Sequence, residues 1–187
     1  MGGIMKIICI NGQGGVGKDT FVKFCGNEDN GIFNVSMIDC IKRIASSIGW
    51  DGTKDSRGRK FLSDLRDLIA EYNDYPFQDV LGKIELAEKQ HEWYKWYINF
   101  NEELICFVHV REPENIARWR QQHGAKALLI RREEVEKDYG NHADDEVFNI
   151  DYDYVIYNDG DLISLRKKAN SFIDNIRKEE WSSNIWK

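Results

Sequence analysis

Short, unbroken runs of apolar residues are the most regular feature of this 187-residue sequence. Most of them carry Val, Ile, Leu and Phe without polar alternation, which is typical of strands covered on both faces of a parallel sheet. We predict five such strands: Lys6 to Ile10, Phe33 to Met37, Leu104 to Val110, Ala127 to Ile130, and Tyr154 to Tyr157.

Apolar residues at helical spacing occupy stretches between these runs. One amphipathic helix is predicted from Phe61 to Tyr72 and another from Leu162 to Ile176. A third is bounded by Pro113 at its start and Gly124 just past its end, which are the positions that these two residue types favour.

Alternating strands and helices predict an α/β fold, a five-stranded parallel sheet flanked by helices, in one domain over residues 1–187. Ligands of such sheets bind at the carboxyl ends of the strands. Two stretches exceed what the sheet needs: residues 51–100 are mostly helical in pattern, and residues 133–149 are charged and lack periodicity. We interpret the first as a helical acceptor-side insertion and the second as a lid-like insertion.

Composition narrows the class of partner. Acidic residues outnumber basic ones by 32 to 26, and the formal charge of -6 would repel nucleic acid and anionic membranes. No apolar stretch approaches the roughly 20 residues that span a bilayer, and the amino terminus lacks a signal-peptide pattern. The four histidines show no metal-ligand spacing with one another or with cysteine, so we expect no zinc site. The four cysteines show no C-x-x-C spacing and two of them lie in apolar runs, so we expect free thiols in a reduced, cytoplasmic protein.

The most specific motif follows the first predicted strand. The segment from Gly12 to Thr20 reads Gly-Gln-Gly-Gly-Val-Gly-Lys-Asp-Thr, which has the spacing of a P-loop through Lys18. Glycines let backbone N–H groups turn toward phosphate oxygens, a helix amino terminus adds positive charge, and the lysine reaches the terminal phosphates. The predicted ATP-binding residues of the loop are Gly12, Gly14, Gly15, Val16, Gly17, Lys18, Asp19 and Thr20.

The metal is expected to be Mg²⁺ bound together with ATP. Asp19 stands where a magnesium-binding hydroxyl is usual, and the hydroxyl is displaced by one position to Thr20. Both residues are therefore candidate metal ligands.

The Lys18-Asp19-Thr20 ending resembles the loop of phage-type deoxynucleoside monophosphate kinases, within the wider group of P-loop nucleoside monophosphate kinases. The segment from Tyr154 to Gly160 is similar to the late strand and Asn-Asp-Gly turn of these kinases and of dephospho-CoA kinases. The resemblance implies a P-loop NTPase three-layer sandwich, with Asn158 and Gly160 near the adenine of ATP.

Two further segments extend the resemblance. The stretch from Val35 to Lys42 resembles the second strand and the helix start that contact the acceptor nucleotide in this group. The stretch from Phe107 to Glu114 resembles the third strand, where phage-type enzymes tend to carry Asp-Val-Arg; here His109 replaces the aspartate. The implied acceptor-binding residues are Ser36, Asp39 and Arg111.

Phosphoryl transfer needs cations around the moving group, and arginine is the expected residue. Arg111, Arg131 and Arg132 each follow or end an apolar run, so with Lys18 they form the predicted catalytic set. Alternative interpretations stay open: Arg131 and Arg132 as a solvated pair, and Arg111 as a partner of Glu112 or Glu114.

Two residues at strand ends have competing interpretations. Asp39 could act as a base toward the acceptor or cap a helix, and the sequence favours neither. His109 lies inside an apolar run, which favours a satisfied core histidine over a catalytic one.

Three functional hypotheses follow. The first is an ATP-dependent kinase that phosphorylates a (deoxy)nucleoside monophosphate to the diphosphate. The second is a kinase of another small molecule, such as a coenzyme precursor, on the same framework. The third is a regulatory module that holds a nucleotide without efficient transfer. In each case the expected partners are ATP and a small molecule rather than nucleic acid or a membrane, and a homodimer is compatible with the sequence.

Overall fold

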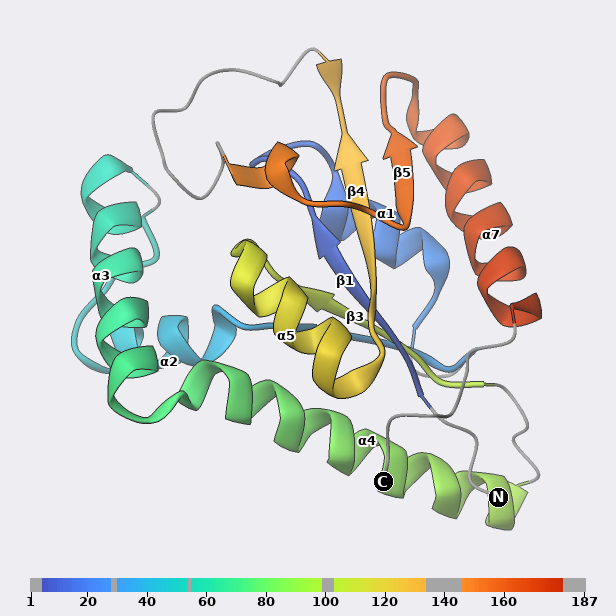
Figure 1. The fold of residues 1–187 in the computed structure, drawn as a ribbon, viewed down its shortest axis with the longest axis horizontal. Coiled ribbons are helices and arrows are strands. Elements are labelled where there is room, and N and C mark those ends of the chain that lie inside the picture. The colour runs from blue at the N-terminus through green and yellow to red at the C-terminus, as the bar shows by residue number, and fades with distance from the viewer. Residues whose placement is uncertain (1–4, 28–29, 54, 99–102, 134–145, 180–187) are drawn as a thin grey trace.

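The computed structural model describes residues 5–27, 30–53, 55–98, 103–133 and 146–179. It is an α/β fold with one five-stranded sheet in the order β2-β3-β1-β4-β5, and every strand pair is parallel (Figure 1). The strands are β1 (Lys6–Asn11), β2 (Ile32–Ser36), β3 (Ile105–His109), β4 (Lys126–Arg131) and β5 (Tyr154–Tyr157). The helices are α1 (Lys18–Cys25), α2 (Asp39–Ser47), α3 (Ser56–Asn73), α4 (Tyr75–Ile98), α5 (Pro113–His123), the 3-10 helix η3 (Glu146–Asn149) and α7 (Leu162–Lys178).

The predicted secondary structure is confirmed in its main parts. All five predicted strands are present, with ends that differ by one residue or none. The helix α5 begins at Pro113 and ends against Gly124, whose φ of 62° is the left-handed conformation that glycine tolerates. Residues 51–100 carry α3 and α4, as their pattern predicts, while residues 134–145 of the predicted lid-like insertion lie outside the described residues.

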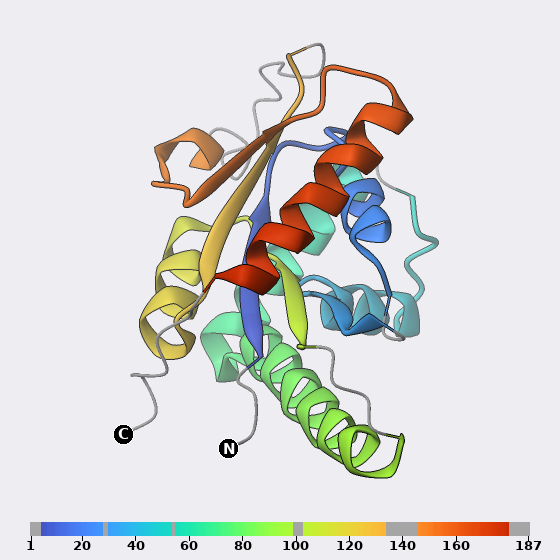
Figure 2. The ribbon, with the colours of Figure 1, turned by 90° about the vertical axis from the view of Figure 1, so that its right-hand side faces the viewer.

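Strand β1 is buried along its whole length because helices cover both faces of the sheet. Its side chains alternate between two cores, since successive residues of a strand point to opposite faces. Ile7 and Cys9 pack in the core under α4 and α5, and Ile8 and Ile10 pack in the core under α1 and α7. Figure 2 shows α1 and α7 side by side on one face, with α5 on the other.

The order of the strands explains this division of the helices. The chain leaves β1 toward β2 at one edge and later crosses from β3 to β4 in the opposite direction. Because parallel crossovers are right-handed, the helices of these two connections must lie on opposite faces. The carboxyl end of β1 is therefore the place where connections diverge and a ligand crevice is expected.

Helices α2 and α3 lie beside the sheet (Figure 1). They share a small hydrophobic cluster that is separate from the two large cores. Its buried members are Cys40, Ile41, Ala45 and Leu62. An ion pair between Arg66 of α3 and Glu112 links this helical region to the start of α5, near the carboxyl ends of the strands.

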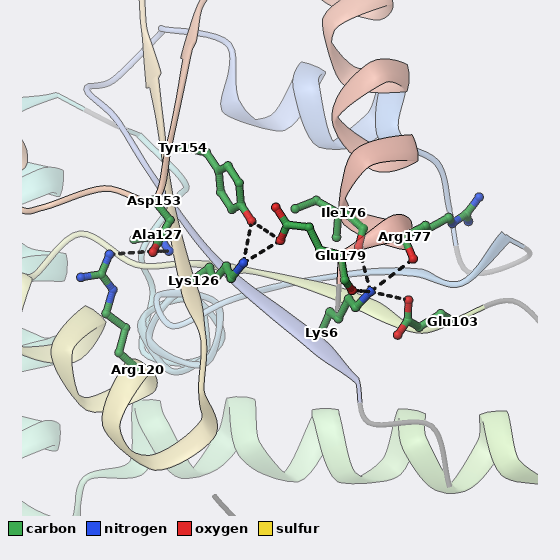
Figure 3. Close-up of polar contacts among 10 residues, drawn as sticks. All are labelled: Lys6, Glu103, Arg120, Lys126, Ala127, Asp153, Tyr154, Ile176, Arg177 and Glu179. Carbon is green, nitrogen blue, oxygen red and sulfur yellow. Dashed lines mark hydrogen bonds and ion pairs between the residues drawn. The ribbon is translucent and has the colours of Figure 1, made fainter. Parts of the chain in front are cut away.

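A polar network lies at the amino-terminal ends of the strands (Figure 3). Lys6 is only 3% exposed, and its Nζ donates to the carbonyl oxygens of Ile176 and Glu179, both at 2.8 Å, at the end of α7. It also pairs with Glu103 at 2.7 Å. A buried ammonium is stable here because it satisfies carbonyl groups that the end of a helix leaves without partners.

Lys126, Tyr154 and Glu179 continue the network beside Lys6 (Figure 3). The hydroxyl of Tyr154 donates to Glu179 Oε2 at 2.6 Å, and Lys126 Nζ donates to the same oxygen at 2.6 Å. Burial is the main reason that the pKa of Tyr154 is raised to about 12. These contacts fasten α7 to β4 and β5 at the edge opposite the strand carboxyl ends.

Within the described ranges, none of the helices combines the length and the apolar character needed to cross a bilayer.

Candidate functional site

The loop that joins β1 to α1 lies at the carboxyl ends of the strands, where the strand order leads us to expect a ligand crevice. Gly12, Gly15 and Gly17 have φ values of 141°, 85° and 96°, which other residue types rarely adopt. A Cβ at Gly12 would collide with the carbonyl oxygen of Ile130. The loop therefore passes directly against the end of β4.

Two buried asparagines form hydrogen bonds with the backbone of this loop. Asn11 accepts from the N–H of Gly12 at 2.7 Å and donates to the carbonyl oxygen of Arg111 at 3.2 Å and to the hydroxyl of Tyr152 at 3.0 Å. Asn158 donates to the carbonyl oxygen of Val16 at 2.9 Å. The loop is thereby fixed to the ends of β3 and β5 as well as to β1.

Asn11 was not among the predicted site residues, although one signal was present: it is a polar residue that directly follows an unbroken apolar strand. Asn158 was predicted beside adenine. Its side chain contacts the backbone of the loop, and a Cβ at Gly17 would come within 2.5 Å of its Nδ2; its place beside adenine stays a prediction. Gly160 lies in the turn before α7, next to Asp161, whose carboxylate accepts from Ser164 N at 2.8 Å.

Lys18 is the first residue of α1, and its ammonium lies over the loop. Its Nζ donates to the carbonyl oxygens of Gly12 and of Gln13, the latter at 2.8 Å. The N-cap residue of α1 is Gly17, which has no side chain to cap the first turn. The charge of Lys18, the backbone of the glycines and the uncapped amino terminus of α1 thus lie close together. This combination of groups binds anions.

Asp19 and Thr20 follow in the first turn of α1. The side chain of Asp19 is 95% exposed, and its Oδ1 lies 3.7 Å from Nδ1 of His109. Thr20 is half-buried. Among the residues that the structure describes, no group of three or more His, Cys, Asp or Glu side chains is arranged to hold a metal ion.

His109 is the last residue of β3, and the prediction of a core histidine holds only in part. Its side chain is 14% exposed and its Nε2 lies 3.0 Å from Oδ1 of Asn34, but its other nitrogen faces Asp19 of the loop. Burial lowers the pKa of His109, and the charge of Asp19 opposes that effect. The imidazole thus contacts the loop, which the apolar run around it did not indicate.

The predicted acceptor-binding residues lie along the same edge. Ser36, at the end of β2, is paired in register with His109. Asp39 is the first residue of α2, whose N-cap is Ile38, and its carboxylate accepts from Lys42 Nζ at 3.2 Å. The alternative that Asp39 caps a helix is therefore wrong, because the helix starts at this residue rather than after it.

The predicted arginines occupy the ends of two other strands. Arg111 is exposed two residues beyond β3, and its carbonyl oxygen is held by Asn11. Arg131 ends β4, with its guanidinium carbon 5.0 Å from the ring centre of Phe148 and 5.6 Å from that of Tyr157. Arg132 follows it and is half-buried. All three lie at the carboxyl edge, on strands that flank the loop on either side.

Comparison with known proteins gives no family for the chain. No protein-family model matches it, and no curated protein matches its sequence. Among solved structures, it is similar to the crystal structure of TT1252 from Thermus thermophilus, with 14% identity and a TM-score of 0.42 over 92% of this chain and 98% of that one. This similarity is too distant to support an inference, so fold and site rest on the geometry above.

Proposed function

We propose that the chain is a P-loop phosphotransferase that moves a phosphoryl group from ATP to a small phosphorylated acceptor, a (deoxy)nucleoside monophosphate. One observation carries the proposal: the glycine-rich loop with Lys18 lies at the uncapped amino terminus of α1, beside the central strand of a parallel sheet. This arrangement concentrates N–H groups and positive charge in a chain whose formal charge is -6.

The loop and β4 would form the side of the site that binds ATP, the phosphoryl donor. The backbone of residues 12–17 would surround the β- and γ-phosphates, and the ammonium of Lys18 would move from the carbonyl oxygens of Gly12 and Gln13 to the terminal phosphates. Arg131 ends β4, Arg132 follows it, and both would neutralise the charge that develops on the transferring group.

The acceptor side is formed by the ends of β2 and β3. Ser36 and Arg111 would hold the acceptor phosphate, with Arg111 able to bind two of its oxygens at once. Asp39 lies at the start of α2 on the same edge and would orient an acceptor hydroxyl. Helix α3, joined to Glu112 through Arg66, lies where it could cover this side.

The oxygen donors of Asp19 and Thr20 fit a divalent cation of the kind that accompanies ATP. These two residues would hold the ion beside the phosphates, where its charge would offset theirs. The protein's own contribution is to position the two substrates, since phosphoryl transfer depends mainly on alignment and electrostatic stabilisation.

A coupled assay of ADP release over a panel of nucleoside and deoxynucleoside monophosphates tests the proposal. We expect one or a few acceptors to stimulate release, and Lys18→Ala to reduce that rate by about a thousandfold or more. Lys23→Ala, which removes an exposed lysine from the last turn of α1, is the matched control and should keep full activity. Tight binding of ATP without stimulation by any acceptor would contradict transfer and favour a nucleotide-binding module.

A further inference from the structure

The contact between Asp19 and His109 is the feature of the site that the proposed function does not yet explain. A carboxylate oxygen on α1 and an imidazole nitrogen on β3 lie 3.7 Å apart, beyond hydrogen-bonding distance. Donor atoms that share one metal ion at about 2.1 Å each lie about 3 to 4 Å apart. The separation therefore suits two ligands of a common cation.

The orientation of His109 supports the same conclusion. Its Nε2 faces Oδ1 of Asn34 at 3.0 Å, and an amide oxygen can only accept. In the neutral imidazole, Nε2 then carries the ring proton, which leaves the lone pair of Nδ1 directed at the Asp19 carboxylate. Two acceptor atoms face each other, and a cation between them removes the repulsion. A partner that fixes the tautomer of a ligating histidine is a regular feature of metal sites.

The position of the pair relative to the loop determines what else would bind the metal. Lys18 adjoins Asp19 in the chain and lies across the loop, so the pair borders the space proposed for the terminal phosphates. Asp19 is almost fully exposed and can adjust by rotation about its own side chain, whereas His109 is held by its strand and by Asn34. Phosphate oxygens and water would complete the coordination.

We propose that Asp19 and His109 form a mixed oxygen and nitrogen site for the nucleotide-bound metal, and that the imidazole makes this site favour first-row transition metals over Mg²⁺, with Mn²⁺ as the experimental probe. The inference rests on the proposed function, because phosphate oxygens supply the remaining ligands. Mg²⁺ is bound by oxygen donors and retains water, whereas an imidazole ligand favours first-row transition metals. Aspartate in the loop keeps one carboxylate at the site, and the histidine sets the choice of metal.

Electron spin-echo spectroscopy of Mn²⁺ bound with ADP to the full chain tests the site directly. We expect modulation from a coordinated histidine nitrogen, its loss in His109→Asp, and its retention in His91→Gln, a control on α4. The ratio of Mn²⁺ to Mg²⁺ affinity, measured by calorimetry with ADP, should fall about tenfold in His109→Asp. Asn34→Ala, which releases the ring, should weaken Mn²⁺ binding about tenfold without removing the nitrogen signal.

The outcomes separate this inference from the proposed function. Mn²⁺ and ADP bound together without a histidine nitrogen signal would overturn the metal site and leave nucleotide binding intact. A ratio of affinities unchanged by His109→Asp would do the same. Failure of ADP to bind at all, with either metal, would overturn both. Folding of His109→Asp is verified by its circular dichroism and its denaturation midpoint, and His109→Gln replaces it if that variant is unfolded.

Discussion

Polar residues at the amino ends of the strands differ in their contacts from those at the carboxyl ends. At the amino edge, Lys6, Lys126 and Glu179 are engaged with other groups of the chain, and they join α7 to the strands. At the carboxyl edge, Asp19 and Arg111 are exposed, and Gly14 has open space where a side chain would be. The same strands therefore have a network of engaged polar groups at their amino ends and exposed residues at their carboxyl ends.

Substitutions at the amino ends of the strands should therefore affect stability, and those at the carboxyl ends should affect binding. Removing a polar group from the closed network leaves its partners unsatisfied, which costs stability. Removing an exposed group from the open edge costs little stability, because water replaces its partners. Gly12 and Gly17 of the loop, and the asparagines Asn11 and Asn158 that bind it, are buried or conformationally restricted although they lie at the open ends of the strands, so their substitution should affect both stability and binding.

The largest effect on stability is expected from Gly12→Ala. The substitution places a Cβ against the carbonyl oxygen of Ile130 at a φ of 141°, so both the loop and β4 must shift. We expect a loss of about 3 kcal/mol or more in the free energy of unfolding, measured with urea. Gly14→Ala is the matched control, because its Cβ meets nothing within 4 Å, and its stability should change by less than about 1 kcal/mol. Equal losses in the two variants would contradict the geometry of the loop.

Lys6→Met should follow, with a loss of about 2 to 3 kcal/mol. The methionine fills similar space but leaves the carbonyl groups at the end of α7 and the carboxylate of Glu103 without their partner. Urea denaturation measures the loss, and Lys178→Met, at an exposed lysine of the same helix end, should be nearly neutral. If catalysis is found, its rate should be unchanged in folded Lys6→Met, because Lys6 lies at the far edge.

Asn158→Ala should reduce both the stability of the fold and the binding of ATP. Loss of the bond to Val16 should cost about 1 to 2 kcal/mol of stability and loosen the loop. Calorimetry should then show weaker binding of ATP, with Asn170→Ala on the exposed face of α7 as the control. Full affinity in Asn158→Ala would show that the loop keeps its conformation without this contact.

The smallest effect is expected from Tyr154→Phe, at about 1 kcal/mol near neutral pH. The effect should depend on pH in a defined direction. Since burial raises the pKa of the folded phenol to about 12 while the unfolded one titrates near about 10, stability is lost as pH rises between these values. Denaturation of the wild type and of Tyr154→Phe from pH 9 to 12 should show a shallower decline in the variant. Parallel curves would contradict the raised pKa.

The sheet could be predicted from the sequence because its strands are signalled locally, by unbroken apolar runs and by the residues that bound α5. The loop was also local, since its glycines and Lys18 are contiguous. The contacts that could not be predicted join residues that lie far apart in the chain. The contact of Lys6 with α7 joins residues 170 positions apart, and that of Asn11 with Tyr152 joins residues 141 positions apart. No periodicity encodes either contact.

Single residues at strand ends were the hardest to interpret. Inside a run such as Phe107 to Val110, the sequence does not say which residue is the last to pair, so His109 was assigned to the core although it faces the loop. Asp39 shows the same limit, because an acidic residue before a helical pattern is compatible with both the N-cap and the first turn. A shift of one residue reverses each interpretation.

The hydrogen bonds of Asn11 have a consequence for how related chains can diverge. Its amide uses both hydrogens and its oxygen, on Arg111, Tyr152 and Gly12, and no other side chain of this size offers two donors and an acceptor in that geometry. Aspartate would lose both donors, and leucine would lose all three bonds. Positions 11 and 152 should therefore change together in evolution: a lineage that replaces the tyrosine removes one of the reasons to keep the asparagine.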